Sequence, residues 1–133
     1  MFRLASRTYG IDLGVVREII PCRSATRLPG APPYVAGLIN VRGAIITVVD
    51  LGARLDGESS ARADGSIILV EQGARVVGLA VDEVLDVQRL AADRLEEQPD
   101  DAAGAGAVRA LGRLGEGVVI VIDVEALIKQ VLL

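Results

Sequence analysis

The chain has 133 residues, of which 51% are hydrophobic, 24% charged and 2% aromatic, and its formal net charge is −4. This length fits one domain, and this balance of apolar and charged residues is that of a globular rather than a disordered protein. The chain has too few basic and aromatic residues for a typical nucleic-acid-binding protein. Because it has no histidine and one cysteine, it cannot form a Ser-His-Asp triad, a histidine zinc site or a thiolate metal cage.

The N-terminal part of the sequence predicts short strands and a proline-rich loop. Residues 2–4 resemble the end of a strand, and residues 7–13 alternate apolar and polar side chains, as in a half-buried strand. A further extended segment covers residues 15–20 and stops at Pro21. The loop at 28–33 holds three prolines, so it cannot join a regular ladder of backbone hydrogen bonds.

The next segment predicts a hairpin followed by a capped helical turn. Strands at 35–41 and 44–49 are joined at Arg42 and Gly43, where glycine supplies the backbone freedom of a tight turn. Asp50 follows directly and is expected to cap one or two helical turns at 51–55, which contributes about 1 kcal/mol. Residues after this helix, from Asp56 to Gly65, are small and polar and are typical of a surface loop.

A second hairpin is predicted from strands at 66–70 and 75–81, with a turn at Gln72 and Gly73. A short strand segment at 84–87 extends or restarts the second of these strands.

The C-terminal part begins with a long connection at 89–107, for which we expect a helical turn near residues 91–96. The last hairpin runs from 108 to 122 around a glycine-rich turn. Asp123 is then expected to cap a short helix from Val124 to about Val131.

Two segments of the sequence resemble each other. VVDLGARL at 48–55 and VIDVEALI at 121–128 share the order aliphatic, aliphatic, Asp, aliphatic, any, Ala, any, aliphatic, at a constant offset of 73 residues. A hairpin, a capping aspartate and a helical turn in two copies indicate two similar β subdomains. Chance similarity between strands rich in valine and isoleucine is an equally good explanation of so short an echo.

Purely aliphatic runs at 67–70 and 118–122 indicate strands that are buried on both faces. A parallel sheet buries strands in this way, but the sequence lacks the crossover helices that it needs. We therefore predict an all-β fold with short helical turns and a short C-terminal helix. In it, two small five-stranded barrels of the SH3 or OB type pack on a shared hydrophobic core, one centred on about residues 15–85 and the other on the remainder.

The sequence offers no convincing enzyme site. GAGAVR at 104–109 lacks the third glycine and the preceding strand of a dinucleotide-binding turn. The acidic cluster of Glu96, Glu97, Asp100 and Asp101 lacks the spacing of a calcium loop. We expect a non-enzyme without metal or cofactor.

The unpaired Cys22 favours a reducing cytoplasm, because small secreted domains usually carry paired cysteines. The chain opens without a basic and apolar leader, and no apolar run approaches the ~18 residues of a membrane span. We therefore expect no direct membrane insertion.

Four segments in this order resemble the CheW family of chemotaxis coupling adaptors: YGIDLGVVREI, LPGAPPYVAGLINVRGAIITVVDL, ARVVGLAVDEVLDV and LGRLGEGVVIVIDVEALI. Departures are Val41, where the family usually has Leu, and Thr47, where Pro is common. The resemblance implies two intertwined β-barrels in a single domain over residues 1–133. It also implies a non-catalytic signalling adaptor that couples the cytoplasmic tips of methyl-accepting chemoreceptors to the regulatory domain of a CheA-type histidine kinase.

The same resemblance implies a cytoplasmic protein at membrane-associated receptor arrays. Weak self-association through apolar strand edges is a separate alternative that the sequence leaves open. An alternative is the regulatory CheW-like domain of a larger CheA- or CheV-type protein, which has the same fold. A carboxylate-using hydrolase and an oligosaccharide-binding barrel fit the residues less well.

Candidate contacts with partners follow from the positions that match the family, and they are Val16, Glu18, Gly37, Asn40, Arg42, Gly43, Ile67 and Ile68. Arg42 is expected to pair with Glu18, an interaction that matters for stability only if it is dry; an exposed arginine without a partner is the alternative. Asn40 either satisfies backbone groups of the turn or contacts a partner.

Other residues of the set have structural explanations beside the functional one. Ile67 and Ile68 would ordinarily be core residues, so their exposure decides between the two roles. Gly37 and Gly78 interrupt strands, which indicates a bulge or a close backbone approach. Asp50, Asp123 and Gly78 are assigned structural or capping roles.

Overall fold

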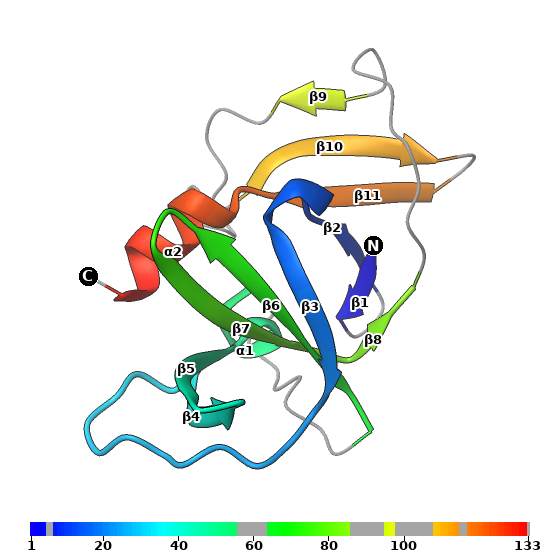
Figure 1. The fold of residues 1–133 in the computed structure, drawn as a ribbon. Coiled ribbons are helices and arrows are strands. Elements are labelled where there is room, and N and C mark those ends of the chain that lie inside the picture. Colours follow the sequence, from blue (N-terminus) through cyan, green and yellow to red (C-terminus); the bar gives the residue numbers. More distant parts are fainter. Residues whose placement is uncertain (5–6, 56–63, 86–94, 98–107, 115–116, 133) are drawn as a thin grey trace.

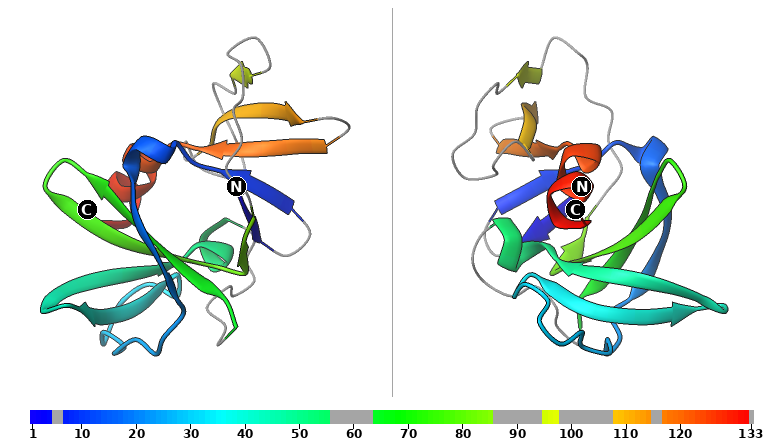
Figure 2. Two further views of the ribbon diagram at one scale, coloured as in Figure 1. Left: turned by 45° about the vertical axis from the view of Figure 1, so that its right-hand side comes forward. Right: turned by 90° about the vertical axis from the view of Figure 1, so that its left-hand side faces the viewer.

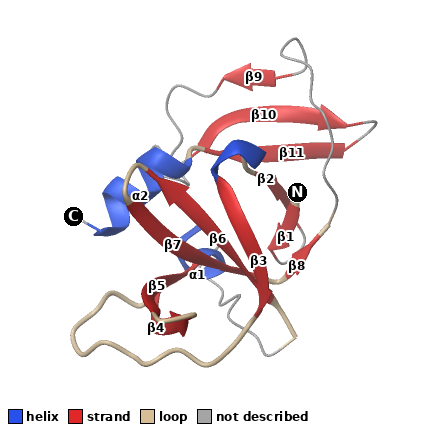
Figure 3. Ribbon diagram, viewed as in Figure 1, coloured by secondary structure: helices blue, strands red, loops and turns tan. Residues whose placement is uncertain are grey.

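The computed structural model describes residues 1–4, 7–55, 64–85, 95–97, 108–114 and 117–132 (Figure 1). The described residues are mostly in strands, with few and short helices (Figure 3). In chain order the elements are β1 (Phe2–Leu4), β2 (Arg7–Gly10), the 3-10 helix η1 (Leu13–Val15), β3 (Val16–Pro21), β4 (Val35–Val41), β5 (Ala44–Asp50), α1 (Leu51–Leu55), β6 (Ser66–Gln72), β7 (Arg75–Val81), β8 (Glu83–Val84), β9 (Leu95–Glu97), β10 (Val108–Leu114), β11 (Gly117–Ile122) and α2 (Val124–Leu132).

These strands form two sheets. A five-stranded sheet has the order β3-β6-β7-β5-β4, and a six-stranded sheet has the order β8-β1-β2-β11-β10-β9. The first sheet uses residues 16–81. The second combines β1 and β2 from the beginning of the chain with four strands that follow residue 82, through the parallel pairing of β2 with β11. Figure 2 shows the blue and orange strands of the second sheet side by side, apart from the green and teal strands of the first.

The two sheets repeat one pattern of pairing. In the first, the antiparallel hairpins β6-β7 and β4-β5 are joined by the parallel pair β5-β7. In the second, the antiparallel hairpins β1-β2 and β10-β11 are joined by the parallel pair β2-β11. Each pattern also carries one more antiparallel strand at the same place, β3 beside β6 and β8 beside β1. This equivalence supports the interpretation of the sequence echo as a repeat.

Strand β6 is buried on both faces, as its aliphatic run predicts. Ile68 and Val70 belong to one hydrophobic cluster, and Ile67 and Leu69 belong to another. The cluster with Ile67 lies among the strands of the five-stranded sheet. The cluster with Ile68 takes residues from both sheets and from α2, so a shared hydrophobic core is confirmed.

Both ends of the chain contribute to this shared core. Phe2 of β1 and Tyr9 of β2 are at most 2% exposed, and their rings stack with centroids 5.9 Å apart. Leu127 and Ile128 of α2 pack in the same cluster. None of the helices in the described part of the chain is both long and apolar enough to cross a membrane.

Several predicted boundaries are wrong. The turn predicted at Gln72 and Gly73 lies one residue later, because β6 continues to Gln72, which pairs with Arg75. The strand predicted at 7–13 ends at Gly10, because the Asp12 carboxylate accepts a hydrogen bond from the Gly14 amide (2.9 Å) and starts η1. The strand predicted at 15–20 begins at Val16 and includes Pro21, which is tolerated because β3 is an edge strand.

The helical turn predicted near 91–96 is also wrong in its described part. Residues 95–97 form β9, which pairs with β10 in an antiparallel manner. Three other predictions lie wholly or mostly outside the described residues. They are the surface loop that begins at Asp56, the strand end at 86–87 and the turn at 115–116.

Candidate functional site

The turn between β4 and β5 holds Arg42 in an unusual conformation. Val41 pairs with Ala44, so the turn has two residues, Arg42 with φ 50° and Gly43 with φ 90°. Positive φ at both central residues is the signature of a type I′ turn, where Asn-Gly is the favoured pair. Arg42 is the one non-glycine residue with positive φ among those that the structure describes.

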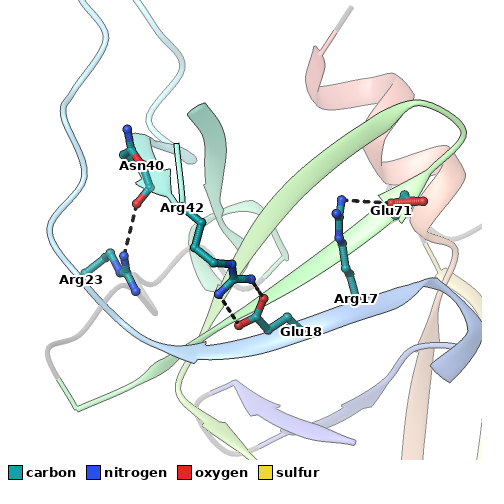
Figure 4. Close-up of polar contacts among 6 residues, drawn as sticks. All are labelled: Arg17, Glu18, Arg23, Asn40, Arg42 and Glu71. Atoms are coloured by element: carbon teal, nitrogen blue, oxygen red, sulfur yellow. Dashed lines mark hydrogen bonds and ion pairs between the residues drawn. The ribbon is translucent and has the colours of Figure 1, made fainter. Parts of the chain in front are cut away.

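Asn40, the second-last residue of β4, accepts one hydrogen bond with its side chain and one with its backbone. Its side-chain oxygen accepts a hydrogen bond from the Gly43 amide at 2.9 Å. Its backbone carbonyl accepts one from the guanidinium of Arg23 at 3.3 Å, drawn in Figure 4. Asn40 therefore satisfies a backbone group of the turn, which is the first of the two roles left open by the sequence, and its contact with a partner stays a prediction.

Arg42 forms the predicted pair with Glu18 of β3. Its Nη1 donates to Oε2 of Glu18 at 3.1 Å and its Nη2 donates to Oε1, so both carboxylate oxygens are engaged (Figure 4). The side chains are 71% and 32% exposed, respectively. Because the pair is solvated, its contribution to stability is small, and its two-point geometry serves instead to orient the arginine.

The charges around Glu18 are mostly positive. The hydrogen bond from Arg42 holds the pKa of Glu18 below its ordinary value, and the charges of Arg17 and Arg23 act in the same direction. Arg17 is itself bonded to Glu71 of β6 at 3.2 Å. We use the term Arg42 face for the six residues of Figure 4, which are Arg17, Glu18, Arg23, Asn40, Arg42 and Glu71.

Exposed aliphatic side chains lie on the strands that carry the Arg42 face. Ile45 of β5 pairs directly with Asn40 and is 64% exposed, and Ile19 of β3 follows Glu18 and is 49% exposed. Because side chains alternate along a strand, Ile45 lies beside Asn40, whereas Ile19 points to the opposite face of β3 from Glu18. Arginine is enriched in protein contacts, and Ile45 adds exposed apolar area beside this face.

Gly37 has a structural explanation. It has φ 142°, it lies at a bulge of β4, and a Cβ there would lie 2.3 Å from the carbonyl oxygen of Thr26. Thr26 forms two backbone hydrogen bonds of 2.8 Å with Leu38. Gly37 therefore lets the segment after β3 approach the outer edge of β4, and its Cα gives a partner no side chain to contact.

Gly78 is also where the sequence predicts a close approach. A Cβ at this position of β7 would lie 2.9 Å from Cγ2 of Ile67 on the neighbouring strand. Gly43, by contrast, has nothing within 4 Å of such a Cβ, and only its positive φ favours glycine.

Ile67 and Ile68 are 0% and 3% exposed. A residue that contacts a partner should be exposed, whereas a core residue should be buried, and by this criterion both isoleucines belong to the core. They are buried because each face of β6 is covered by a different hydrophobic cluster. Val16 is partly buried against the shared core, which leaves part of its side chain accessible.

Both predicted caps are confirmed, with the same geometry. The Asp50 carboxylate accepts a hydrogen bond from the Ala53 amide at 3.1 Å, and that of Asp123 accepts one from the Ala126 amide at 3.1 Å. The two halves of the sequence echo thus place equivalent atoms in equivalent bonds.

Three members of the Arg42 face were not anticipated from the sequence, namely Arg17, Arg23 and Glu71. Arg17 and Glu71 are 54 residues apart, and Arg23 lies 17 residues before Asn40. No local pattern marks such contacts, because they depend on the pairing of β3 with β6 and on the path of the chain after β3.

Comparisons with known proteins agree with this architecture. The family model described as "CheW-like domain" matches residues 1–132. The chemotaxis protein CheW of Klebsiella aerogenes is 33% identical over 133 residues, which cover 98% of this chain and 80% of the relative. That of Rhizobium meliloti is 38% identical over 103 residues, 77% of this chain and 66% of the relative. The crystal structure of scaffolding protein TtCheW from Thermoanaerobacter tengcongensis is similar with a TM-score of 0.83 and 32% identity, over 92% of this chain and 85% of that one.

Proposed function

Because the chain belongs to the family of CheW-like domains, we propose that it couples methyl-accepting chemoreceptors to a CheA-type histidine kinase. Members of this family are non-catalytic adaptors, and this chain is a chemotaxis scaffolding protein of that kind. The named relatives favour this role over the alternative of a regulatory domain within a larger kinase.

The observation that carries the proposal is the Glu18–Arg42 pair. Its two residues are at positions that match the family, and they lie on a solvated surface held by a rigid turn. An adaptor needs such a preformed surface, because ordering long side chains on binding lowers the affinity. In the proposal, Val16, Glu18, Asn40, Arg42 and Gly43 form or support a contact face.

Two partners are proposed, the regulatory domain of the kinase and the helical tip of a receptor. The first has the same fold as this chain by family resemblance, and the second is an amphipathic helical hairpin that suits an apolar groove. Such a protein works in the cytoplasm at membrane-associated arrays, where many weak contacts, including weak self-association, add up.

We also propose that each sheet is the wall of one small barrel, within a single domain over residues 1–133. The second sheet has six strands rather than the five expected, because β9 pairs with β10. The two backbone hydrogen bonds between Thr26 and Leu38 support closure of the five-stranded sheet, because Thr26 continues from β3 at one edge and Leu38 lies in β4 at the other. The Gly37 bulge at this contact supports it further.

Reconstitution with a CheA-type kinase and a receptor cytoplasmic fragment tests the coupling function. We expect the wild-type chain to raise kinase autophosphorylation and Arg42→Ala to lose most of this gain while it remains folded by circular dichroism. Arg17→Ala is the matched control, since it breaks a solvated ion pair of the same face and leaves Glu18–Arg42 intact. A folded and fully active Arg42→Ala protein would remove Arg42 from the contact face.

A further inference from the structure

We propose that Asn40 is a positioning residue, which fixes the Arg42 turn in the one conformation that brings the guanidinium to Glu18. This inference deepens the proposed function and rests on it, because it explains how the contact face is held ready for a partner. The resemblance to the family predicts Asn40 as a contact residue, and both hydrogen bonds described for it are made within the chain.

The backbone conformation of Arg42 is unfavourable for arginine, so another residue must stabilise it. A side chain with φ 50° is disfavoured, since Cβ then crowds the following carbonyl, and a two-residue turn with arginine at its first position has competing conformations with negative φ. Most type I′ turns avoid this problem with asparagine or glycine at that position. Here arginine occupies it, so the conformation must be held by something other than its own preference.

Asn40 lies at the right place to hold it. The bond from the Gly43 amide to the Asn40 side chain, 2.9 Å long, spans Arg42 and ties the far side of the turn to the end of β4. On the other side, Arg23 donates to the Asn40 carbonyl at 3.3 Å and restrains the strand itself. Figure 4 shows Asn40 and Glu18 on opposite sides of Arg42, so the asparagine acts on the turn without touching the carboxylate.

Asn40 therefore acts on the Glu18–Arg42 pair indirectly, by stabilising one conformation of the turn. If the Asn40 bond is lost, the turn samples conformations in which Arg42 points away, and the two-point contact with Glu18 is made for a smaller fraction of the time. One net hydrogen bond corresponds to a factor of about two to ten in such an equilibrium.

The Glu18 carboxylate is a local reporter of this equilibrium. Its pKa is lowered chiefly by the hydrogen bond from Arg42, so its titration midpoint, followed by carbon-13 NMR, measures how often the pair is formed. We expect Asn40→Ala to raise this midpoint and Asn40→Asp, which keeps an oxygen acceptor for the Gly43 amide, to keep it low. Arg17→Ala is the reference for loss of a neighbouring charge alone, because Arg17 is a lesser cause of the lowered pKa.

The outcomes are decisive in both directions. A midpoint that rises in Asn40→Ala, by more than in Arg17→Ala, and is restored in Asn40→Asp supports the positioning role. An unchanged midpoint in folded Asn40→Ala overturns it. If Asn40→Ala does not fold, Asn40→Gln decides in the same way, since it keeps the amide but displaces its oxygen from the turn.

A second arm separates this inference from the proposed function. Affinity for the kinase regulatory domain, measured by calorimetry, is expected to fall about two- to tenfold in Asn40→Ala, in line with the population of the turn. If the Glu18 midpoint moves while the affinity does not, the positioning role stands and the assignment of this face to the kinase contact fails.

Discussion

The guanidinium of Arg42 reaches Glu18 from a backbone conformation that most side chains avoid. The conformation of the two-residue turn therefore determines whether Arg42 contacts a residue 24 positions away in the sequence. The turn could be anticipated from Gly43, and the pairing with Glu18 from the resemblance to the family. The positive φ of Arg42 and the bond from Gly43 to Asn40 could not, because a sequence pattern shows where a turn lies but not how each side chain completes it.

The solvated pair has a pH dependence whose sign is fixed by the pKa of Glu18. This pKa lies below its ordinary value of 4.5 in the folded protein, so the stabilisation from the pair is present above that value and is lost as the pH falls through the folded pKa. We expect wild type to be slightly more stable than Arg42→Ala at about pH 7, and this advantage to shrink as the pH is lowered through the folded pKa of Glu18. Urea unfolding of both proteins across this pH range measures this; a stability difference that grows in acid would contradict it.

The two capping aspartates are a matched pair at the same scale. Asp50→Ala and Asp123→Ala each remove an acceptor 3.1 Å from an orphan helix amide, so each should lower the free energy of unfolding by about 1 kcal/mol. Asp50 is 6% exposed, so its variant should lose at least as much as that of Asp123. Asn at either position retains an acceptor and should recover most of the loss in chemical denaturation. An unaltered midpoint in both alanine variants would remove the capping assignment.

At the scale of elements, the edges of the five-stranded sheet are the features that are hardest to predict from local sequence patterns. Hairpins and their turns follow from glycine positions and alternation, which act over a few residues. The contact of Thr26 with Leu38 depends instead on how the whole sheet curves, and only the glycine at position 37 hints at it. Likewise, residues 95 and 96, for which a helical turn is expected, belong to β9, because pairing with the edge of β10 stabilises the strand more than a weak local preference stabilises a helix.

Gly37 tests the importance of this edge contact. Gly37→Ala places Cβ 2.3 Å from the Thr26 carbonyl oxygen at φ 142°, so we expect the free energy of unfolding to fall by about 3 kcal/mol. Gly30→Ala is the matched control, since φ is 78° there but nothing lies within 4 Å of its Cβ, and it should cost about 1 kcal/mol. Faster reaction of the partly buried Cys22 with a thiol reagent in Gly37→Ala would show that the segment after β3 has moved. Equal losses in the two variants would count against a tight backbone contact.

The two faces of β6 give a further element-scale prediction. Ile67→Ala and Ile68→Ala remove fully buried side chains from two different clusters, so each should lower the free energy of unfolding by about 2–5 kcal/mol. The affinity of the folded fraction for a kinase domain should not change. Ile45 is 64% exposed, so Ile45→Ala should lower the affinity for the kinase domain and leave the free energy of unfolding unchanged. Weaker binding by Ile68→Ala at unchanged stability would return this residue to the contact set.

At the scale of the whole molecule, the chain uses one pattern of strand pairing in both sheets and joins them through a common core. The echo between Asp50 and Asp123 pointed to this repeat, and the equivalent caps and strand pairs support it. The second pattern could not be foreseen in full, because its β1-β2 hairpin comes from the start of the chain while its partner β11 comes from the end. Two similar sheets that share one core give an adaptor a separate outer surface on each sheet.

Simultaneous binding of the two partners is the most direct test of the coupling role. The affinity of the chain for a CheA-type regulatory domain is to be measured by calorimetry, alone and with a saturating receptor cytoplasmic fragment. An adaptor with separate surfaces should bind the kinase domain at least as tightly when the receptor fragment is present, and the three proteins should migrate as one complex. Displacement of one partner by the other would show that they compete for a single surface, and it would contradict the account of this chain as a bridge.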